Sequence, residues 1–223
     1  MIPYVLVIAG VLVHALRFKR DETHTDTIIC MRFVPDGSGD VLSPKKAANS
    51  GSSRSALYRA AREGRLQRIA RGVYVRADAP PGDWDWIEAA ARKPQATICL
   101  VSALAYHDLT DTIPGALDVA IPRGSRIPAG ASAIRWHAFD RGTFELGRDV
   151  IPVPWVSMTI GMYSPERSIA DAFRLRGEVG YEIGRDALRE WLRRGGKPTA
   201  LTTVASQLPR AKGPLLRALE SLA

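Results

Sequence analysis

Residues 52–76, SSRSALYRAAREGRLQRIARGVYVR, combine a short basic helix with a tight two-stranded ribbon. At about 100° per residue, the segment that starts at Arg54 places small apolar side chains on one side. The polar side chains gather within an arc of about 140° on the other side; they are Arg54, Ser55, Tyr58, Arg59 and Arg62. We therefore expect a helix with one packing face and one cationic face.

Cap and turn residues mark where this helix begins and ends. Ser52 or Ser53 can accept hydrogen bonds from the free amides of the first turn, and Gly64 suits a left-handed C-cap. After Gly64 the sequence changes to β-forming residues on both sides of Ala70-Arg71-Gly72. Gly72 can take the positive φ of a hairpin tip, so a ribbon follows the helix.

A cationic helix followed by a cationic hairpin is typical of a winged helix-turn-helix. The second helix of that motif enters the major groove, and the hairpin touches phosphates or the minor groove. Here Arg68 and Arg71 supply the charge of the hairpin. Ser43-Pro44 predicts a short first helix over 44–48, followed by a turn at 49–51. The alternative interpretation is a solvated basic helix beside a purely structural hairpin.

The positive charge of the chain is concentrated in this segment. The chain has a net charge of +8, and residues 31–76 hold ten Lys/Arg against three Asp/Glu. Residues 77–223 hold eighteen against seventeen and are almost neutral. Such a local surplus favours attraction to phosphate, whereas the mostly alanine apolar face of the helix is too weak to insert into a membrane. The DNA-facing set that we expect is Lys45, Lys46, Ser53, Arg54, Ser55, Tyr58, Arg59, Arg62, Arg68 and Arg71.

The first 30 residues have a different character. The apolar run 2–16 is about 15 residues long, short of the roughly 20 that span a bilayer. It also lacks the features of a secretory signal. We interpret residues 1–30 as an upstream extension outside the working protein, with translation starting at Met31. A signal anchor and a packed N-terminal helix or strand are the alternatives. MRFVPDGSGD (31–40) is a poor first helix for a complete winged helix-turn-helix.

The rest of the chain predicts a second domain of α+β class, with a small sheet flanked by helices. ADAPPGD (77–83) is the linker, so the expected domains are 31–78 and 84–223. Five short β-runs are expected between 116 and 162, including FELG at 144–147. Ser164-Pro165 opens a helix, and the apolar spacing of 183–192 predicts another. Helices are also expected at 84–92, 199–208 and 215–222.

No catalytic or metal site follows from the chemistry-bearing residues. Cys30 and Cys99 are far apart in sequence, and the four histidines show no ligand spacing. Ser102, His107 and Asp171 lack a nucleophile elbow, so we expect a structural role for them. We expect no cofactor, and a reducing, cytoplasmic setting is the simplest interpretation.

Five motifs in a fixed order resemble one protein family. They are SRSALYRAAREGRLQRIARGVYV, SALAYHDLTDTIP, DVAIPRG, SPERSIADAFRLR and a final amphipathic helix. Over roughly residues 41–223 the chain resembles the AbiEi antitoxins of type IV toxin–antitoxin systems.

The resemblance implies two activities. An N-terminal winged helix would bind double-stranded promoter DNA and repress its own operon, and a C-terminal domain would neutralise a nucleotidyltransferase-like toxin. The residues that match the C-terminal pattern of the family, and so are candidates for partner binding, are Ser102, His107, Arg123, Glu166, Arg167 and Asp171.

Two alternatives to a non-enzymatic antitoxin stay open. One is an orphan winged-helix regulator without a toxin, which the neighbouring gene would distinguish. The other is an enzyme, a nuclease or an atypical kinase, that the DNA-binding segment delivers to its substrate. The sequence shows no glycine-rich phosphate loop, and no Glu-x-Lys at the spacing of a metal-dependent nuclease.

Overall fold

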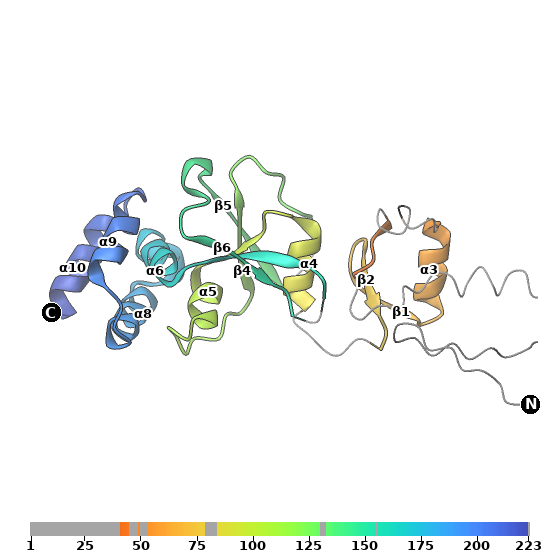
Figure 1. Ribbon diagram of the computed structural model, residues 1–223, viewed down its shortest axis with the longest axis horizontal. Coiled ribbons are helices and arrows are strands. Elements are labelled where there is room, and N and C mark those ends of the chain that lie inside the picture. Colours follow the sequence, from red (N-terminus) through yellow and green to blue (C-terminus); the bar gives the residue numbers. More distant parts are fainter. Residues whose placement is uncertain are drawn as a thin grey trace, which may run out of the picture. The chain divides into compact units, whose positions relative to one another are not determined.

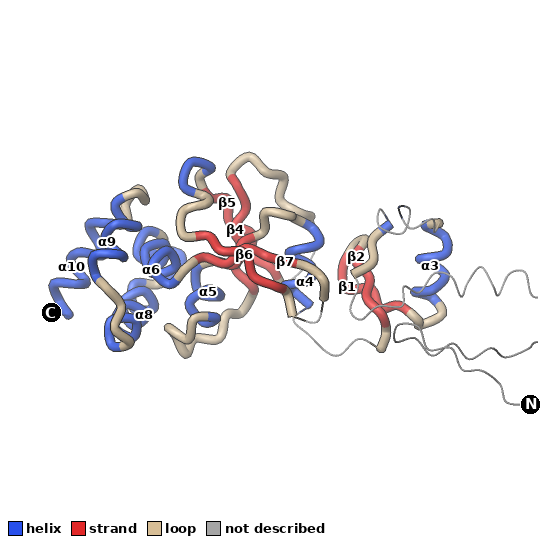
Figure 2. Tube along the Cα trace, in the orientation of Figure 1, coloured by secondary structure: helices blue, strands red, loops and turns tan. Residues whose placement is uncertain are grey.

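The computed structural model describes residues 41–44, 49, 53–78, 84–129, 133–154 and 156–222, and it is of the expected α+β class (Figures 1 and 2). All of these residues belong to one unit, Asp36–Ala223. Several predictions fall outside the described residues: the extension 1–30, the segment 31–40, Lys45, Lys46 and most of the linker 77–83. Pro44, the first residue of the predicted helix 44–48, is helical. Asn49 is helical too, so the predicted turn at 49–51 is wrong at Asn49.

The basic stretch folds as the sequence predicts. α3 (Arg54–Arg62) is followed by β1 (Leu66–Ala70) and β2 (Val73–Arg76), which pair antiparallel. Gly64 and Gly72 have φ of 73° and 76°, so each of these two turns uses the left-handed backbone that glycine tolerates. Leu42 forms a β-bridge to Tyr74, with Leu42 N donating to Tyr74 O at 2.7 Å. The ribbon thus also holds the segment that precedes the first helix.

A mixed five-stranded sheet forms the centre of the rest of the chain. It comprises β3 (Thr97–Ile98), β4 (Leu117–Pro122), β5 (Ile134–Phe139), β6 (Arg148–Pro152) and β7 (Thr159–Tyr163). Their spatial order is β5-β4-β3-β7-β6. β4 with β5 and β3 with β7 are parallel, whereas β3 with β4 and β6 with β7 are antiparallel. The very short β3 therefore joins the two halves of the sheet.

The predicted β-run FELG at 144–147 is wrong. The structure has a 3-10 turn, η1 (Arg141–Thr143), followed by turn residues up to Gly147. The Asp140 carboxylate accepts a hydrogen bond from Gly142 N at 2.9 Å, and Gly147 has a φ of 63°. A side-chain cap and a left-handed glycine thus fix a turn in spite of the β-forming residues.

One helix precedes the five-stranded sheet, and another connects two of its strands. α4 (Trp84–Arg92) buries Ile87 and Ala90 in a core cluster with Ile98, Val119 and Ile160. α5 (Leu100–Tyr106) directly follows β3 and packs against α6. A second apolar cluster comprises Cys99, Leu100, Ala120, Phe139, Phe144 and Tyr163. Because Val119 and Ala120 are neighbours on β4, the two clusters lie on opposite faces of the strand.

The C-terminal helices gather into one group with its own core (Figure 1). Ser164 caps α6, its Oγ accepting from Arg167 N, and Pro165 opens the helix as expected. Trp191 and Leu188 of α8 are buried together with Phe173 of α6. This group comprises α6 (Pro165–Arg174), α7 (Arg176–Val179), α8 (Tyr181–Arg193), α9 (Pro198–Ser206) and α10 (Lys212–Leu222).

Candidate nucleic-acid interface

α3 presents the cationic face that the sequence predicts. Its inner side buries Leu57 and Ala60 completely or nearly so. Ser53 is the N-cap, with its Oγ accepting from Ala56 N at 3.1 Å. The residues of the opposite side are all exposed: Arg54, Ser55, Tyr58, Arg59 and Arg62. The cap and the two buried side chains therefore fix the direction in which three guanidinium groups point.

The arginines of α3 differ from those of α8 in their carboxylate partners. Among the residues that the structure describes, Arg54, Arg59 and Arg62 form no ion pair, and α3 has no acidic residue in its first turn. Every arginine of α8, by contrast, is paired with a carboxylate of the same helix, either Glu182, Asp186 or Glu190. Three arginines without a carboxylate partner are therefore gathered on one face of α3.

The ribbon adds two exposed arginines beside this helix. Arg68 lies on β1, where its Nε donates to Ala70 O at 3.3 Å across a shift in the strand register. Arg71 is at the tip of the hairpin. Arg76 instead pairs with Asp78 at 2.7 Å, and these hydrogen bonds hold the pKa of Asp78 below its usual range. Arg68 and Arg71 are thus the cations that the ribbon offers to an anion.

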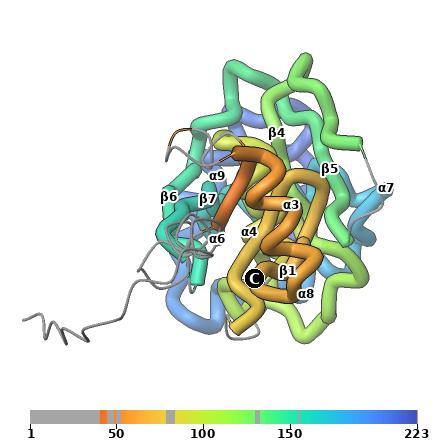
Figure 3. The backbone as a smooth tube through the Cα atoms, turned by 90° about the vertical axis from the view of Figure 1, so that its right-hand side faces the viewer, coloured from red at the N-terminus to blue at the C-terminus, as the bar shows by residue number. Residues whose placement is uncertain are grey.

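Two tyrosines connect the helix to the ribbon. Tyr58 of α3 is about half exposed, and its ring centroid lies 6.3 Å from that of the buried Tyr74 on β2. Figure 3 shows α3 and β1 side by side in this part of the chain. The backbone of Tyr74 also forms hydrogen bonds with Leu42. The contact between the two rings therefore links the exposed face of α3 to the β1–β2 ribbon and the segment around Leu42. Tyr58 is thus positioned with its ring partly free.

The candidates for partner binding lie in several different environments. Arg123 is exposed, and Glu166 is half-buried and accepts from Ser164 Oγ at 2.9 Å. His107 is the C-cap of α5, and its Nε2 lies 2.8 Å from Tyr163 O. Ser102 is buried and its Oγ accepts from Asp118 N. These hydrogen bonds give Ser102 and His107 a structural role.

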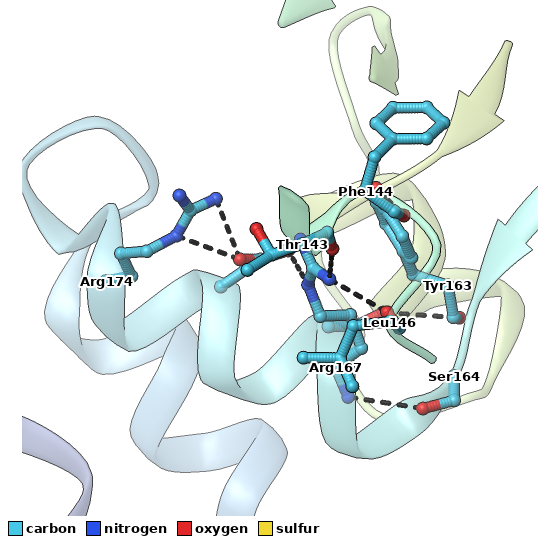
Figure 4. A network of polar contacts seen from close by, with 9 residues as sticks. Thr143, Phe144, Leu146, Tyr163, Ser164, Arg167 and Arg174 are labelled. Carbon is cyan, nitrogen blue, oxygen red and sulfur yellow. Dashed lines mark hydrogen bonds and ion pairs between the residues drawn. The ribbon is translucent and has the colours of Figure 1, made fainter. Parts of the chain in front are cut away.

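Arg167 and Asp171 form a buried charge network (Figure 4). The Arg167 guanidinium donates to Asp171 at 2.8 Å and to the carbonyl oxygens of Thr143 and Leu146. Arg174 donates to the other oxygen of Asp171 at 2.9 Å. Burial raises the pKa of Asp171, while the two arginines act in the opposite direction. The pair is therefore completely enclosed and joins α6 to η1 and the turn that follows it.

One cluster gives no signal in the sequence. Asp118 on β4 is buried and contacts both Arg135 and His137 on β5, which is its neighbour in the sheet. The sequence separations are 17 and 19 residues, so no local spacing indicates the contact. Only an alternation of polar residues at 135 and 137, on a strand beside a buried aspartate, could have suggested it.

Within the described ranges, no group of three or more His, Cys, Asp or Glu residues is arranged to hold a metal ion. The described helices also include none with the length and apolarity needed to cross a membrane. Cys99 is a buried free thiol, and burial raises its pKa.

Residues 35–77 match the protein family described as transcriptional regulator, AbiEi antitoxin. The match contains α3, β1 and β2, and therefore the exposed residues Arg54, Arg59, Arg62, Arg68 and Arg71. No curated protein matches the chain. The resemblance indicated by the sequence motifs is thus confirmed for this segment, which assigns a regulator role.

Proposed function

We propose that this chain, a member of the AbiEi antitoxin family through residues 35–77, binds double-stranded promoter DNA through α3 and the β1–β2 ribbon. In this proposal α3 enters the major groove as the second helix of a winged helix-turn-helix, and the ribbon touches the phosphates. The protein represses its own promoter and neutralises a nucleotidyltransferase-like toxin encoded beside it.

The observation that carries the proposal is the unpaired charge of α3. Arg54, Arg59 and Arg62 are exposed on one helical face and have no carboxylate partner among the described residues. An exposed arginine that is free of ion pairs can neutralise a phosphate and release its counterion without first breaking a salt bridge. The same guanidinium can form two hydrogen bonds to a guanine edge in the major groove.

The positions of the polar side chains along α3 also support recognition of bases. Recognition helices place residues of their N-terminal part against base edges. Arg54 and Ser55 open α3, and Tyr58 and Arg59 lie one turn further on the same face, so we assign base contacts to these four residues. Arg68 and Arg71, on the ribbon, are assigned to phosphates, where a contact provides affinity but no sequence information.

A gel-shift titration on the DNA upstream of the gene tests the assignment of α3. Arg59→Ala should cost roughly 1–3 kcal/mol at the cognate site and should broaden the sequence preference. Arg189→Ala is the matched control, because Arg189 is an exposed helical arginine that is paired with Asp186. Equal affinity of parent, Arg59→Ala and Arg189→Ala would refute the assignment.

The ribbon has a different signature in the same titration. Arg68→Ala or Arg71→Ala should weaken binding to cognate and unrelated DNA alike. Each substitution should also reduce the slope of log K against log salt by about one. An unchanged slope in both variants would mean that the ribbon does not contact DNA. The assignment of α3 would still stand, because Arg59→Ala tests it separately.

Toxin neutralisation is tested separately from DNA binding. A nucleotidyltransferase reading frame directly beside this gene is expected. Its product, expressed alone, should arrest growth, and co-expression of this chain should relieve the arrest. If no such gene is present, the orphan-regulator interpretation is favoured. Turnover of plasmid with Mg²⁺, or of labelled ATP, by the purified chain would favour an enzyme instead.

A further inference from the structure

A pocket of about 460 Å³ opens between the sheet and the C-terminal helices. Its walls come from the start of α5, the loop that leads to β4, the edge strand β5 and the helices α7 and α8. In Figure 3, α7 lies beside β5, in agreement with the contact between Glu178 and His137. The volume lies in the range of pockets that hold small organic ligands. None of the proposed DNA contacts belongs to this pocket.

The polar side of the pocket is organised around one buried carboxylate. Asp118 is 2% exposed, and its Oδ1 accepts from His137 Nε2 at 2.9 Å and from Arg135 Nη1 at 3.3 Å. Its backbone N–H donates to Ser102 Oγ, which fixes the residue further. Among the described residues, no hydrogen bond or ion pair reaches the second oxygen, Oδ2. The buried carboxylate thus keeps one free acceptor.

The pocket has a second carboxylate in its lining. Its lining contains the carboxylates of Asp118 and Glu178, together with Arg135 and His137. Glu178 is mostly exposed, and one oxygen of its carboxylate lies 3.9 Å from His137 Nδ1. This distance is too long for a strong hydrogen bond. A cationic group in the pocket would therefore meet the free oxygen of Asp118 and the weakly engaged carboxylate of Glu178.

The remaining lining is apolar and includes a strained residue. Leu100 is 1% exposed and has a φ of 48°, a backbone conformation that is unusual for a leucine and often found at functional sites. Ile113, at 90% exposure, also lines the pocket together with Val179 and Ile183. If the apolar part of a ligand covers this exposed isoleucine, its side chain is removed from water, which favours binding.

We propose that this pocket binds a monovalent organic cation, an ammonium or guanidinium group carried on an apolar chain. The cationic group donates hydrogen bonds to Asp118 Oδ2 and to the carboxylate of Glu178. The apolar chain packs on Ile113, Val179 and Ile183. The ligand is either a free small molecule or a Lys or Arg side chain of a protein partner, since both present the same group.

NMR titration of the full ¹⁵N-labelled chain with n-butylguanidinium tests the proposal. Saturable shifts are expected at 113–118, 135–137 and 178–183, with a Kd on the order of 1 mM for so small a probe. Glu178→Gln should weaken binding about five- to tenfold, because one charge-assisted hydrogen bond is lost. Glu220→Gln, an exposed acid outside the pocket, is the matched control and should bind like the parent.

Two neutral or anionic analogues of the probe complete the test. Butyrate and n-butanol carry the same chain without the positive charge and should bind at least about tenfold more weakly. Equal binding of n-butanol, or equal affinity of the parent and Glu178→Gln, would overturn the proposal. So would the absence of saturation up to about 20 mM probe.

The peptide acetyl-Ala-Arg-Ala-amide separates the two sources of the cation. If it produces the same shifts as n-butylguanidinium, the pocket accepts the side chain of a protein partner. If only the small cation binds, the ligand is a free molecule. The result is independent of DNA binding, because Arg54, Arg59 and Arg62 are not part of the pocket.

Discussion

The stability of the C-terminal part of the chain depends on a single residue, Asp171. Its carboxylate is enclosed by two guanidinium groups. Arg167 and Asp171 are both 0% exposed, and Arg174 reaches the same carboxylate at 2.8 Å. Arg167 also lies 4.4 Å from the centre of the Tyr163 ring. A buried cation is tolerated only while its counter-charge is in place.

Asp171→Asn should therefore destabilise the protein strongly. The substitution leaves the buried Arg167 without an anion, and loss of one partner of a buried pair costs about 3–5 kcal/mol. Urea unfolding followed by circular dichroism measures the change in the free energy of unfolding. Asp186→Asn, which removes an exposed carboxylate paired with Arg185 and Arg189, should cost less than about 1 kcal/mol. Similar costs for the two variants would mean that Asp171 does not hold the network together.

At the scale of elements, α8 is held to the loop after α5 by its C-terminal residues. Arg194, the C-cap of α8, donates to the carbonyl oxygens of His107 and Asp108, the latter at 2.6 Å. Glu190 accepts from both Arg193 and Arg194. These hydrogen bonds lower the pKa of Glu190 from 4.5 to about 2. Glu190 thus orients the guanidinium group of Arg194, which joins α8 to the loop after α5.

The free energy of unfolding should depend on pH through Glu190. Because the folded pKa is depressed, the contribution is complete above pH 4.5 and is lost as the pH falls towards about 2. Glu190→Gln should therefore be less stable than the parent at pH 7, and this difference should shrink between pH 4.5 and about 2. Chemical unfolding at several pH values measures it. A difference that stays constant over this range would rule out the contribution of Glu190.

At the scale of the whole molecule, the arginines of α3 and those of α8 form two different kinds of surface. The arginines of α3 have no carboxylate partner among the described residues, whereas those of α8 are neutralised within their own helix. Salt should therefore weaken attraction of phosphate to the proposed DNA-binding surface on α3, whereas α8 has no such attraction to lose. The proposed DNA and toxin activities should accordingly be separable by substitution.

The triple variant Arg54→Ala, Arg59→Ala, Arg62→Ala should lose repression of a promoter reporter. The same variant should still relieve growth arrest by the product of the neighbouring nucleotidyltransferase gene, because its substitutions lie outside residues 84–223. A double Arg185→Ala, Arg189→Ala variant is the control and should retain repression. Loss of both activities in a well-folded triple variant would show that toxin neutralisation also needs α3.

The sequence by itself determined the local elements of this protein. The cationic face of α3, the glycines at 64 and 72, and the Ser164-Pro165 start of α6 follow from periodicity and cap chemistry, which act over a few residues. Local preference failed at 144–147, where a side-chain cap and a left-handed glycine produced a turn instead of a strand. The α+β class also followed, since it depends only on the kinds of element present.

Only the tertiary structure decided the strand order β5-β4-β3-β7-β6 and the groups that this order brings together. Asp118 meets Arg135 and His137 because β4 and β5 are parallel neighbours, and Arg167 meets the carbonyl groups of Thr143 and Leu146 because α6 packs beside that turn. The physical reason is that pairing between distant segments depends on the packing of the whole core. The residues between 118 and 137 carry no periodic signal that specifies such a contact.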